Sequence, residues 1–434
     1  MRRLVDDRLL AWKDSSERRP LLVRGARQVG KTWSLRRFGS SAFEEVLEIN
    51  LESQVAAHRA FAGNLDAATV LAGLETIMRR VISPGRTLLF LDEIQACPRA
   101  ILALRYLYEE RPELHVVAAG SLLEFALGEV SFPVGRIDFL EMHPLSFAEY
   151  LRAVGNERGA DMVAAPPEKL PDAVHVGLLD ELRNYCFVGG MPESVASYRQ
   201  HASLQRCAEV QRRLADTFKQ DFPKYAGRSD VGCLEAVFET LPASVGRQIT
   251  YTRLARDFTG PTAKKAFRML RTARIATRVR STPEPRLPLA AGASGRRFKA
   301  IALDVGLWNQ LSGLRTDVEY ARPDILDVHR GAMAEQFVGQ EILAGGAPEL
   351  FYWARAARGS TAEVDYLAVS GGEVYGVEVK SGAGGSLRSM HRLLEDHPKV
   401  AGGLVFSSRP YEELPDQKLT FLPVYYAGYA TRTR

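Results

Sequence analysis

The segment GARQVGKT, residues 25–32, constrains the fold of this chain more than any other feature. It follows the short apolar run Leu21–Val23 and precedes a helical pattern, TWSLRRFGS. Two glycines let the backbone curl so that successive N–H groups face one point, and the following helix directs its positive end there. This order of strand, loop and helix predicts a phosphate-binding loop in an α/β domain, and a glycine-rich turn with an accidental lysine is the alternative.

Each residue type in the loop has a chemical role in binding ATP. Lys31 would neutralise charge on the β- and γ-phosphates, and the Thr32 hydroxyl would ligate Mg²⁺. The backbone of the loop would contact the nucleotide through Gly25, Ala26, Arg27, Gln28, Val29 and Gly30.

A second segment, TLLFLDEIQ, supports this interpretation. The apolar run Leu88–Leu91 predicts a buried strand of a parallel sheet, and it ends in Asp92 and Glu93. Asp92 would hold Mg²⁺ through water, and Glu93 would orient and deprotonate the attacking water. An acidic helix cap is the alternative, and the loop upstream favours catalysis.

Composition sets broad limits on the class of protein. A chain of 434 residues with 46% hydrophobic and 25% charged residues predicts two or three globular domains. No stretch approaches the ~20 consecutive apolar residues that span a bilayer, and the N-terminal MRRLVDDRLLAWK predicts a surface helix. The scattered cysteines favour reduced thiols in a cytoplasmic protein, and the net charge of +5 permits a nucleic-acid partner without requiring one.

The chain resembles prokaryotic ATPases that carry a C-terminal restriction-endonuclease-like domain of unknown function. Its first part is similar to AAA-type ATPases of the additional-strand P-loop class. The phrases that carry the resemblance run in order along nearly the whole chain: RGARQVGKT, LFLDEIQACP, AAGSLLEFAL, GRIDFLEMHPLSFAEYL, FVGGMPESV, KAIALDVGL, AEVDYLAV and VEVKSG. The resemblance implies an oligomerising nucleotide switch with ATP and Mg²⁺ as cofactors.

The resemblance also implies roles for three further elements. Ser121, after the strand pattern HVVAAG, would contact the γ-phosphate or water, or it would simply cap the helix Leu122–Leu127. Arg136 would reach a neighbouring subunit's γ-phosphate as an arginine finger, or it would be a surface ion-pair arginine. The segment Gly189–Val195 resembles the turn in the lid of signal-transduction ATPases, and a plain helix-entry turn explains it equally well.

The middle of the chain predicts a DNA-contacting arrangement. Helix 251–258, a turn, helix 262–273, a strand at 275–280 and a returning strand RRFKAIAL form a winged-helix pattern. The second helix would contact phosphates of double-stranded DNA, or it would merely present a solvated face. The basic residues concerned are Lys264, Lys265, Arg268 and Arg271.

The C-terminal part predicts a helix, a meander of three strands, a helix and a strand, an order that resembles the PD-(D/E)XK nuclease fold. In that resemblance Asp365 lies on the second strand, Glu378 and Lys380 on the third, and Glu335 on the preceding helix. Residues two apart on a strand project together, and Asp365 can meet them across the hairpin. The carboxylates would hold Mg²⁺, and Lys380 would activate water or steady the phosphate.

One departure from the motif and two alternatives keep other interpretations open. The Pro-Asp of the motif is absent, since Glu363 and Val364 precede Asp365. The same residues could form a half-solvated hairpin with cross-strand ion pairs, or the fold could be retained for binding or structure without cleavage.

Together these patterns predict an α/β protein with an AAA-type domain at residues 1–177, a helical lid and winged-helix region at 178–310, and a nuclease-like domain at 311–434. The predicted function is ATP hydrolysis coupled to DNA binding or metal-dependent DNA cleavage, in defence or DNA maintenance, by a cytoplasmic homo-oligomer. The alternative is a nucleotide-dependent regulatory or scaffolding protein that binds protein partners through an inactive nuclease-like domain.

Overall fold

The computed structural model describes residues 2–121, 135–225, 231–313, 330–356, 362–380 and 386–431. The chain divides into two compact units, Arg2–His143 and Pro144–Arg434, called here the N-terminal and C-terminal units. The helix predicted at Leu122–Leu127 lies outside the described residues. Among the helices that the structure describes, none is long and apolar enough to cross a bilayer. All four cysteines are buried thiols.

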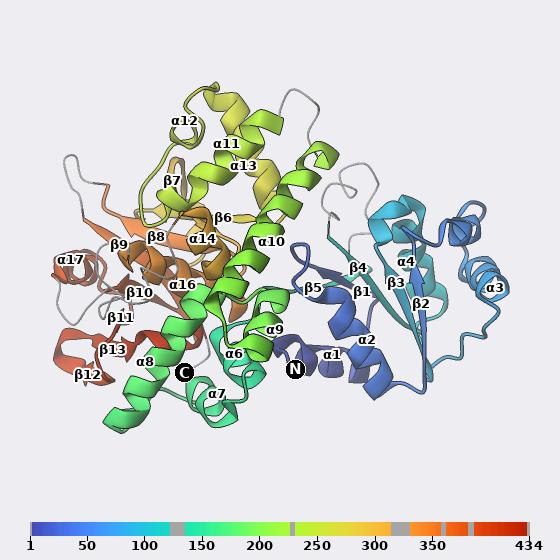
Figure 1. The fold of residues 1–434 in the computed structure, drawn as a ribbon, viewed down its shortest axis with the longest axis horizontal. Helices are drawn as coiled ribbons and strands as arrows, with labels where there is room; N and C mark the ends of the chain where they lie inside the picture. Colours follow the sequence, from blue (N-terminus) through green and yellow to red (C-terminus); the bar gives the residue numbers. More distant parts are fainter. Residues whose placement is uncertain are drawn as a thin grey trace. The chain divides into compact units, whose positions relative to one another are not determined.

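The N-terminal unit is built on a five-stranded parallel sheet with the order β2-β3-β4-β1-β5 (Figure 1). β4 therefore lies between β3 and β1, in keeping with the additional-strand class that the sequence resembles. The strands are β1 (Leu21–Arg24), β2 (Glu45–Asn50), β3 (Thr87–Asp92), β4 (His115–Gly120) and β5 (Asp138–Glu141). The longer helices are α1 (Leu4–Asp14), α2 (Lys31–Ala42), α3 (Ala67–Met78) and α4 (Pro98–Glu110).

Apolar side chains of this sheet pack against helices whose first residues are set by local capping signals. The Asp66 side chain accepts a hydrogen bond from the Thr69 amide and caps α3, and Pro98 begins α4 with the fixed φ that suits a first helical turn. α3 and α4 then bury their apolar faces against Leu89 and Leu91 of β3. Because β3 is buried along its full length, its carboxyl end delivers Asp92 to the sheet edge in a fixed position.

The C-terminal unit contains a helical part and one eight-stranded sheet (Figure 1). Its first helices are α6 (Phe147–Ala153), α7 (Glu157–Ala164), α8 (Asp172–Val188), α9 (Pro192–His201), α10 (Leu204–Tyr225) and α11 (Val231–Thr240). α12 (Tyr251–Leu254), shorter than predicted, and α13 (Gly260–Thr272) precede the antiparallel hairpin of β6 (Ala276–Thr282) and β7 (Ser294–Ala302). α14 (Val305–Leu311) follows the hairpin.

The rest of the chain has the predicted order of helix, meander, helix and strand. α16 (Arg330–Ala344) is followed by the antiparallel strands β8 (Leu350–Ala354), β9 (Glu363–Ser370) and β10 (Glu373–Val379). α17 (Arg388–Asp396) then crosses to β11 (Gly402–Ser407), which pairs parallel to β10. The short strands β12 (Glu412–Leu414) and β13 (Leu419–Pro423) complete the sheet order β12-β13-β11-β10-β9-β8-β6-β7.

The hairpin after α13 is continuous with this sheet, because β6 pairs parallel to β8 from Val279 opposite Leu350 to Thr282 opposite Trp353. The predicted boundaries at 177/178 and 310/311 therefore do not coincide with the observed division at 143/144. Strand pairing across 310/311 and helix packing across 177/178 make residues 144–434 one compact unit.

A buried hydrogen-bond network ties the Gly189–Gly190 turn to the start of α14. The Asp304 carboxylate accepts from the Gly190 amide at 2.6 Å and from the Leu307 amide at 2.9 Å. Burial raises the pKa of Asp304 to about 6, and the hydrogen bonds from the Gly190 and Leu307 amides oppose that rise. At Gly190 a Cβ atom would lie 2.1 Å from the Leu145 carbonyl oxygen, which only glycine avoids. The segments FVGGMPESV and KAIALDVGL are thus joined by the hydrogen bond between Gly190 and Asp304. The turn leads directly into α9, which begins at Pro192.

Replacing Asp304 with Asn should destabilise the C-terminal unit by about 1–3 kcal/mol, because an amide presents one oxygen to two buried N–H donors. The N–H left without an acceptor stays fully buried, since Asp304 is 0% exposed. Chemical denaturation of the full chain measures the change, with Asp416→Asn on the surface as the matched control. An unchanged midpoint would show that this contact does not hold the turn.

Candidate functional site

The predicted phosphate-binding loop connects β1 to α2 in the N-terminal unit. Gln28 and Gly30 adopt left-handed φ angles of 63° and 94°, which curl the loop so that α2 begins at Lys31. A side chain at Gly25 would place its Cβ atom 2.3 Å from the Met142 carbonyl oxygen, so the first position must be glycine. The loop therefore has the strand–loop–helix context that the sequence predicted.

Lys31 lies inside this loop. Its ammonium group donates to the Gly25 carbonyl at 3.0 Å and to the Ala26 carbonyl at 2.8 Å, and the residue is only 7% exposed. The positive charge is thus held where the loop amides and the start of α2 also direct their positive ends. A phosphate group bound in the loop would meet this charge.

Asp92 and Thr32 meet at the carboxyl end of β3. The Thr32 hydroxyl lies 3.1 Å and 3.3 Å from the two carboxylate oxygens of Asp92. Burial raises the pKa of Asp92, and the hydrogen bond from Thr32 opposes that rise. Glu93 follows with a left-handed φ of 48°, and its carboxylate accepts from the Gln95 side-chain amide at 2.5 Å. A hydroxyl, a buried carboxylate and a second carboxylate therefore adjoin the loop.

Ser121 follows β4, the strand between β3 and β1, so it lies at the same sheet edge as the loop and Asp92. It is 4% exposed, and among the described residues its hydroxyl has no hydrogen-bond partner. A buried hydroxyl without a partner points to a group that completes it. Contact with a bound phosphate or water stays a prediction, and the capping alternative involves a helix outside the described residues.

Sequence reasoning missed Arg3, which precedes α1 and is only 4% exposed. Its guanidinium donates to the Val29 carbonyl of the loop at 3.2 Å and to the His143 carbonyl at 2.8 Å. The predicted surface helix is present as α1, and Arg3, the residue before it, is hydrogen-bonded to the loop. No local pattern signals this role, because both partners are distant in sequence.

Arg136 lies on the surface of the N-terminal unit and its side chain is 47% exposed. Its guanidinium donates to Glu109 at 2.7 Å, which is the surface ion pair that the alternative interpretation described. An action on a neighbouring subunit's nucleotide stays a prediction.

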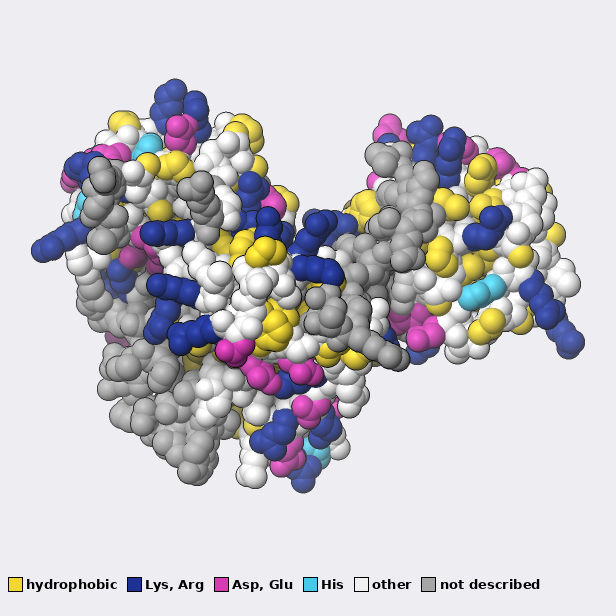
Figure 2. Space-filling model, turned by 90° about the horizontal axis from the view of Figure 1, so that it is seen from above, with side chains coloured by type: hydrophobic (Ala, Val, Ile, Leu, Met, Phe, Trp, Pro, Cys, Tyr) yellow, Lys and Arg dark blue, Asp and Glu magenta, His cyan; other side chains and the backbone are white. Residues whose placement is uncertain are grey.

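The predicted DNA-contacting helix is α13, whose outer face is basic. Lys264, Lys265, Arg268 and Arg271 are all exposed, while Ala263, Ala266, Phe267 and Leu270 are buried. Figure 2 looks down on the side where Figure 1 shows α11–α13, and Lys and Arg side chains recur across that part of the C-terminal unit. The face is available to a polyanion, and phosphate contact stays a prediction.

The predicted nuclease residues gather where β9 and β10 pair. Val377 lies opposite Tyr366, which brings Glu378 next to Asp365 on the neighbouring strand. On its other side β9 carries a β-bulge, because Phe351 pairs with Leu367 and Trp353 pairs with Val364. Asp365 and Tyr366 thus oppose a single residue of β8, and such a bulge redirects side chains.

The redirected side chains meet α16 and β10. The Asp365 carboxylate accepts from the Val379 amide at 2.9 Å, and the Tyr366 hydroxyl donates to the Glu335 carbonyl at 2.8 Å. Lys380 donates to Glu378 at 2.5 Å. Glu335 and Asp365 converge, as the sequence predicted, but on a residue that it did not.

That residue is Lys299 of β7, which is 2% exposed. Its ammonium nitrogen lies 2.6 Å from a Glu363 oxygen, 3.1 Å from an Asp365 oxygen and 3.2 Å from a Glu335 oxygen. The signal in the sequence is a lysine inside the apolar strand pattern FKAIA, where a charged residue needs a buried partner.

Close carboxylates and burial shift the pKa values of this region. Burial, and then repulsion from Asp365, raises the pKa of Glu335 and that of Glu378, while the neighbouring ammonium groups of Lys299 and Lys380 oppose the rise. Burial alone would lower the pKa of Lys299, but attraction to Asp365, Glu335 and Glu363 outweighs burial and raises it well above its ordinary value. Lys299 is therefore an ammonium ion at any physiological pH.

Comparison with known proteins identifies the first part of the chain. Residues 17–151 match the model of a family described as an AAA domain. This part of the chain is therefore similar to AAA domains. Residues 179–318 and 330–426 match two models described as domains of unknown function, DUF8612 and DUF4143. Among curated proteins, none matches the sequence.

Solved structures give only a distant likeness. The Aeropyrum pernix Orc1 protein in complex with DNA is 14% identical with a TM-score of 0.28, over 72% of this chain and 93% of that one. The Thermotoga maritima RuvB Holliday junction branch migration motor is 16% identical with a TM-score of 0.32, over 68% and 90%. AMPPCP-bound DnaA from Aquifex aeolicus is 14% identical with a TM-score of 0.29, over 62% and 86%. We draw nothing about function from likenesses at this level.

The AAA-type domain has donors that fit a nucleotide and Mg²⁺. The positive charge of Lys31 and the loop amides suit phosphates, and the paired Thr32 hydroxyl and Asp92 carboxylate are the oxygen ligands that Mg²⁺ prefers. When bound, the ion would neutralise charge that develops on the transferred phosphate. Ser121, buried without a partner in the described part of the chain, is consistent with a ligand at the same edge.

The carboxylates of the C-terminal unit do not fit a divalent metal ion as they are arranged. Lys299 forms an ion pair with one oxygen of Glu335 and one oxygen of Asp365, while Glu378 pairs with Lys380. Within the described residues, no group of three or more His, Cys, Asp or Glu side chains is placed to hold a metal ion. Ligation of Mg²⁺ by Glu335, Asp365 and Glu378 stays a prediction that this geometry does not favour.

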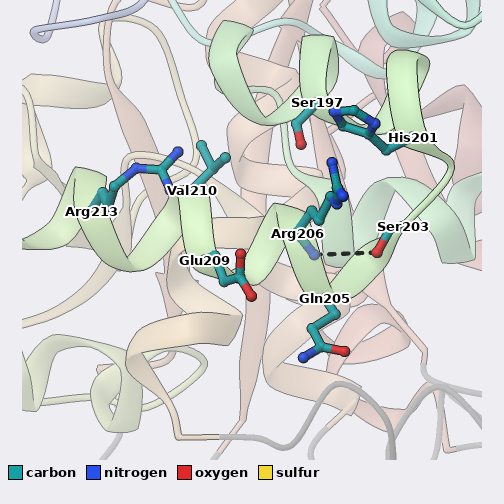
Figure 3. Close-up of a pocket in the computed structure, with 8 residues that line it drawn as sticks. All are labelled: Ser197, His201, Ser203, Gln205, Arg206, Glu209, Val210 and Arg213. Carbon is teal, nitrogen blue, oxygen red and sulfur yellow. Dashed lines mark hydrogen bonds between the residues drawn. The ribbon is translucent and has the colours of Figure 1, made fainter.

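A hollow of about 560 Å³ lies between α9 and α10, and no pattern in the sequence indicates it (Figure 3). Its lining is polar, and Arg213 on one side already pairs with Glu193 at 3.0 Å. The lining residues are Ser197, His201, Ser203, Gln205, Arg206, Glu209, Val210 and Arg213. His201, Gln205, Arg206 and Glu209 are open to solvent, so we assign it no ligand.

Proposed function

We propose that this chain is an ATP-hydrolysing switch that contacts double-stranded DNA through the basic face of α13. The observation that carries the nucleotide half is the meeting of Lys31, Thr32, Asp92 and Glu93 at one sheet edge of an AAA-type domain. In the proposed reaction Lys31 offsets phosphate charge, Thr32 and Asp92 hold Mg²⁺, and Glu93 takes a proton from the attacking water.

The DNA part of the proposal rests on α13, whose basic and apolar residues lie on opposite faces. One face packs into the core through Phe267 and Leu270, so the opposite face cannot turn inward and its cations remain in solvent. Lys264 and Arg268 are four residues apart and project side by side, as two phosphate contacts on one strand require. Arg136 remains a candidate for reaching the nucleotide of a second copy of the chain, in which case the active form is a homo-oligomer.

Metal-dependent cleavage of DNA, the other activity predicted from the sequence, stays a prediction. It requires a divalent ion held by Glu335, Asp365 and Glu378. Lys299 already forms ion pairs with Glu335 and Asp365. That arrangement favours the alternative in which the nuclease-like domain binds without cutting.

Reversing two charges on α13 tests the DNA half. Lys264→Glu with Arg268→Glu should weaken binding to double-stranded DNA by roughly 10–100-fold at low salt and reduce the salt slope by about 2, because each lost phosphate contact releases one counterion fewer. Fluorescence anisotropy with a labelled duplex measures both quantities.

The matched control is Lys399→Glu with Lys418→Glu, which makes the same change of net charge on exposed residues of the same unit. It should leave affinity within about threefold of the unmodified protein, since a lysine that makes no phosphate contact releases no counterion on binding. Equal losses in the two variants would refute a contact through α13.

A further inference from the structure

Lys299 is enclosed by three carboxylates that come from two different elements, Glu335 from α16 and Glu363 and Asp365 from β9. We call these four residues the Lys299 cluster. An ammonium group has three N–H donors, and each carboxylate accepts within 3.2 Å of the nitrogen. The donors of Lys299 are therefore fully used inside the cluster.

The remaining carboxylate oxygens are also engaged or enclosed. The second Glu363 oxygen accepts from the Gln248 amide, and the second Asp365 oxygen accepts from the Val379 amide. Against the second Glu335 oxygen lies Gly246, where a Cβ atom would come within 3.1 Å. A divalent ion needs several oxygens facing one open point, and here that point is filled by nitrogen.

Lys299 is also unable to leave the cluster as a surface lysine would. It lies within β7, opposite Val279 in the pair with β6, and it is 2% exposed. The ring of Tyr352 lies 5.5 Å from its nitrogen and closes another side. Without their cation, the buried carboxylates would face one another with no compensation, which is strongly unfavourable.

We propose that the Lys299 ammonium is the resident cation of this cluster and takes the place of a divalent metal ion. A nuclease-like fold then keeps its carboxylates as an internal ion cluster that joins β7, α16 and β9. The cluster carries out no metal-dependent cleavage of phosphodiester bonds. This inference is independent of the proposed ATPase.

Terbium binding to the full chain without nucleotide tests the inference. Tyr352 is close enough to sensitise Tb³⁺ emission at this point. The unmodified protein should show no emission that Asp365→Asn removes. Lys299→Met should gain a saturable Tb³⁺ site. Its affinity for Tb³⁺ should be at least about 100-fold higher than that of the same point in the unmodified protein, because a unit positive charge has left the carboxylates. Lys299→Met with Asp365→Asn should lose that emission.

A second variant covers failure of Lys299→Met to fold. Lys299→Met with Glu363→Gln removes one buried charge but keeps Glu335 and Asp365, and it should bind Tb³⁺ in the same way. Cooperative thermal unfolding checks each variant, and Mn²⁺ should raise the melting temperature of the Lys299→Met proteins by more than it raises that of the unmodified protein. Two results would overturn the proposal: emission in the unmodified protein that depends on Asp365, or folded Lys299→Met variants that gain no metal site.

Discussion

Replacing Lys31 with alanine should leave the AAA-type domain folded but without tight ATP binding. The Lys31 nitrogen lies 2.8 Å from the Ala26 carbonyl and is held inside the loop by two hydrogen bonds, so its charge is already placed where phosphates bind. At the dielectric of a protein surface, a unit charge about 4 Å from a phosphate contributes roughly 4 kcal/mol. Its loss should weaken ATP binding by at least about 100-fold.

Isothermal titration with ATP and Mg²⁺ measures this loss. Lys13→Ala is the matched control, because Lys13 is a lysine of the same unit at the end of α1. It should bind ATP as the unmodified protein does. Cooperative thermal unfolding checks that the Lys31→Ala protein is folded. Tight binding by the Lys31→Ala protein would show that the loop is not the nucleotide site.

The nucleotide site could be predicted from the sequence because each of its parts is local. A buried strand, two glycines, a lysine and a helix start within residues 21–32 fix the loop, and Asp92 is the last residue of its own strand. Ser121 and Glu93 were found in the same way, at the ends of strands. What joins them is the sheet order, in which β4 lies between β3 and β1, and that order came from the resemblance.

The cluster of the C-terminal unit could be predicted only in part. The alternation along β10 and the hairpin to β9 place Glu378 beside Asp365, and the sequence carries that pattern. Lys299 could not be placed, because its burial depends on partners 36 to 66 residues away and on β6 pairing with β8. The bulge that redirects Asp365 is likewise a property of the β8–β9 pair and not of either strand.

Arg3 and Asp304 show the same limit. Each is a charged residue in an unremarkable local pattern, and each is buried against backbone groups more than 20 residues away. Turn composition at Gly189 and Gly190 suggested either a lid motif or a helix-entry turn, and local sequence offered no way to choose. Close approach explains both glycines, because a Cβ atom at Gly189 would lie 2.2 Å from an Asp304 oxygen and one at Gly190 would lie 2.1 Å from the Leu145 carbonyl oxygen.

Replacing Glu93 with glutamine should preserve ATP binding and slow hydrolysis by about 10²–10⁴-fold, the range for loss of a general base. Glu93 directly follows Asp92. Asp92 pairs with the Thr32 hydroxyl, whereas the Glu93 carboxylate accepts from the Gln95 side-chain amide. In the proposed reaction Glu93 therefore acts on water while Asp92 holds the metal ion. Glutamine has the same size but cannot accept a proton, so binding and chemistry should separate.

The Glu93→Gln amide can also be accommodated, because the Gln95 side-chain oxygen is buried and has no hydrogen-bond partner in the described part of the chain. It can accept from the new amide, so the local fold should persist. Single-turnover release of phosphate measures the chemical step, and titration with ATP measures binding. Glu113→Gln, on the surface of the same unit, is the control and should hydrolyse ATP at the normal rate. If hydrolysis by the Glu93→Gln protein fell less than tenfold, another group would have to activate the water; if binding fell with it, Glu93 would serve the nucleotide and not the reaction.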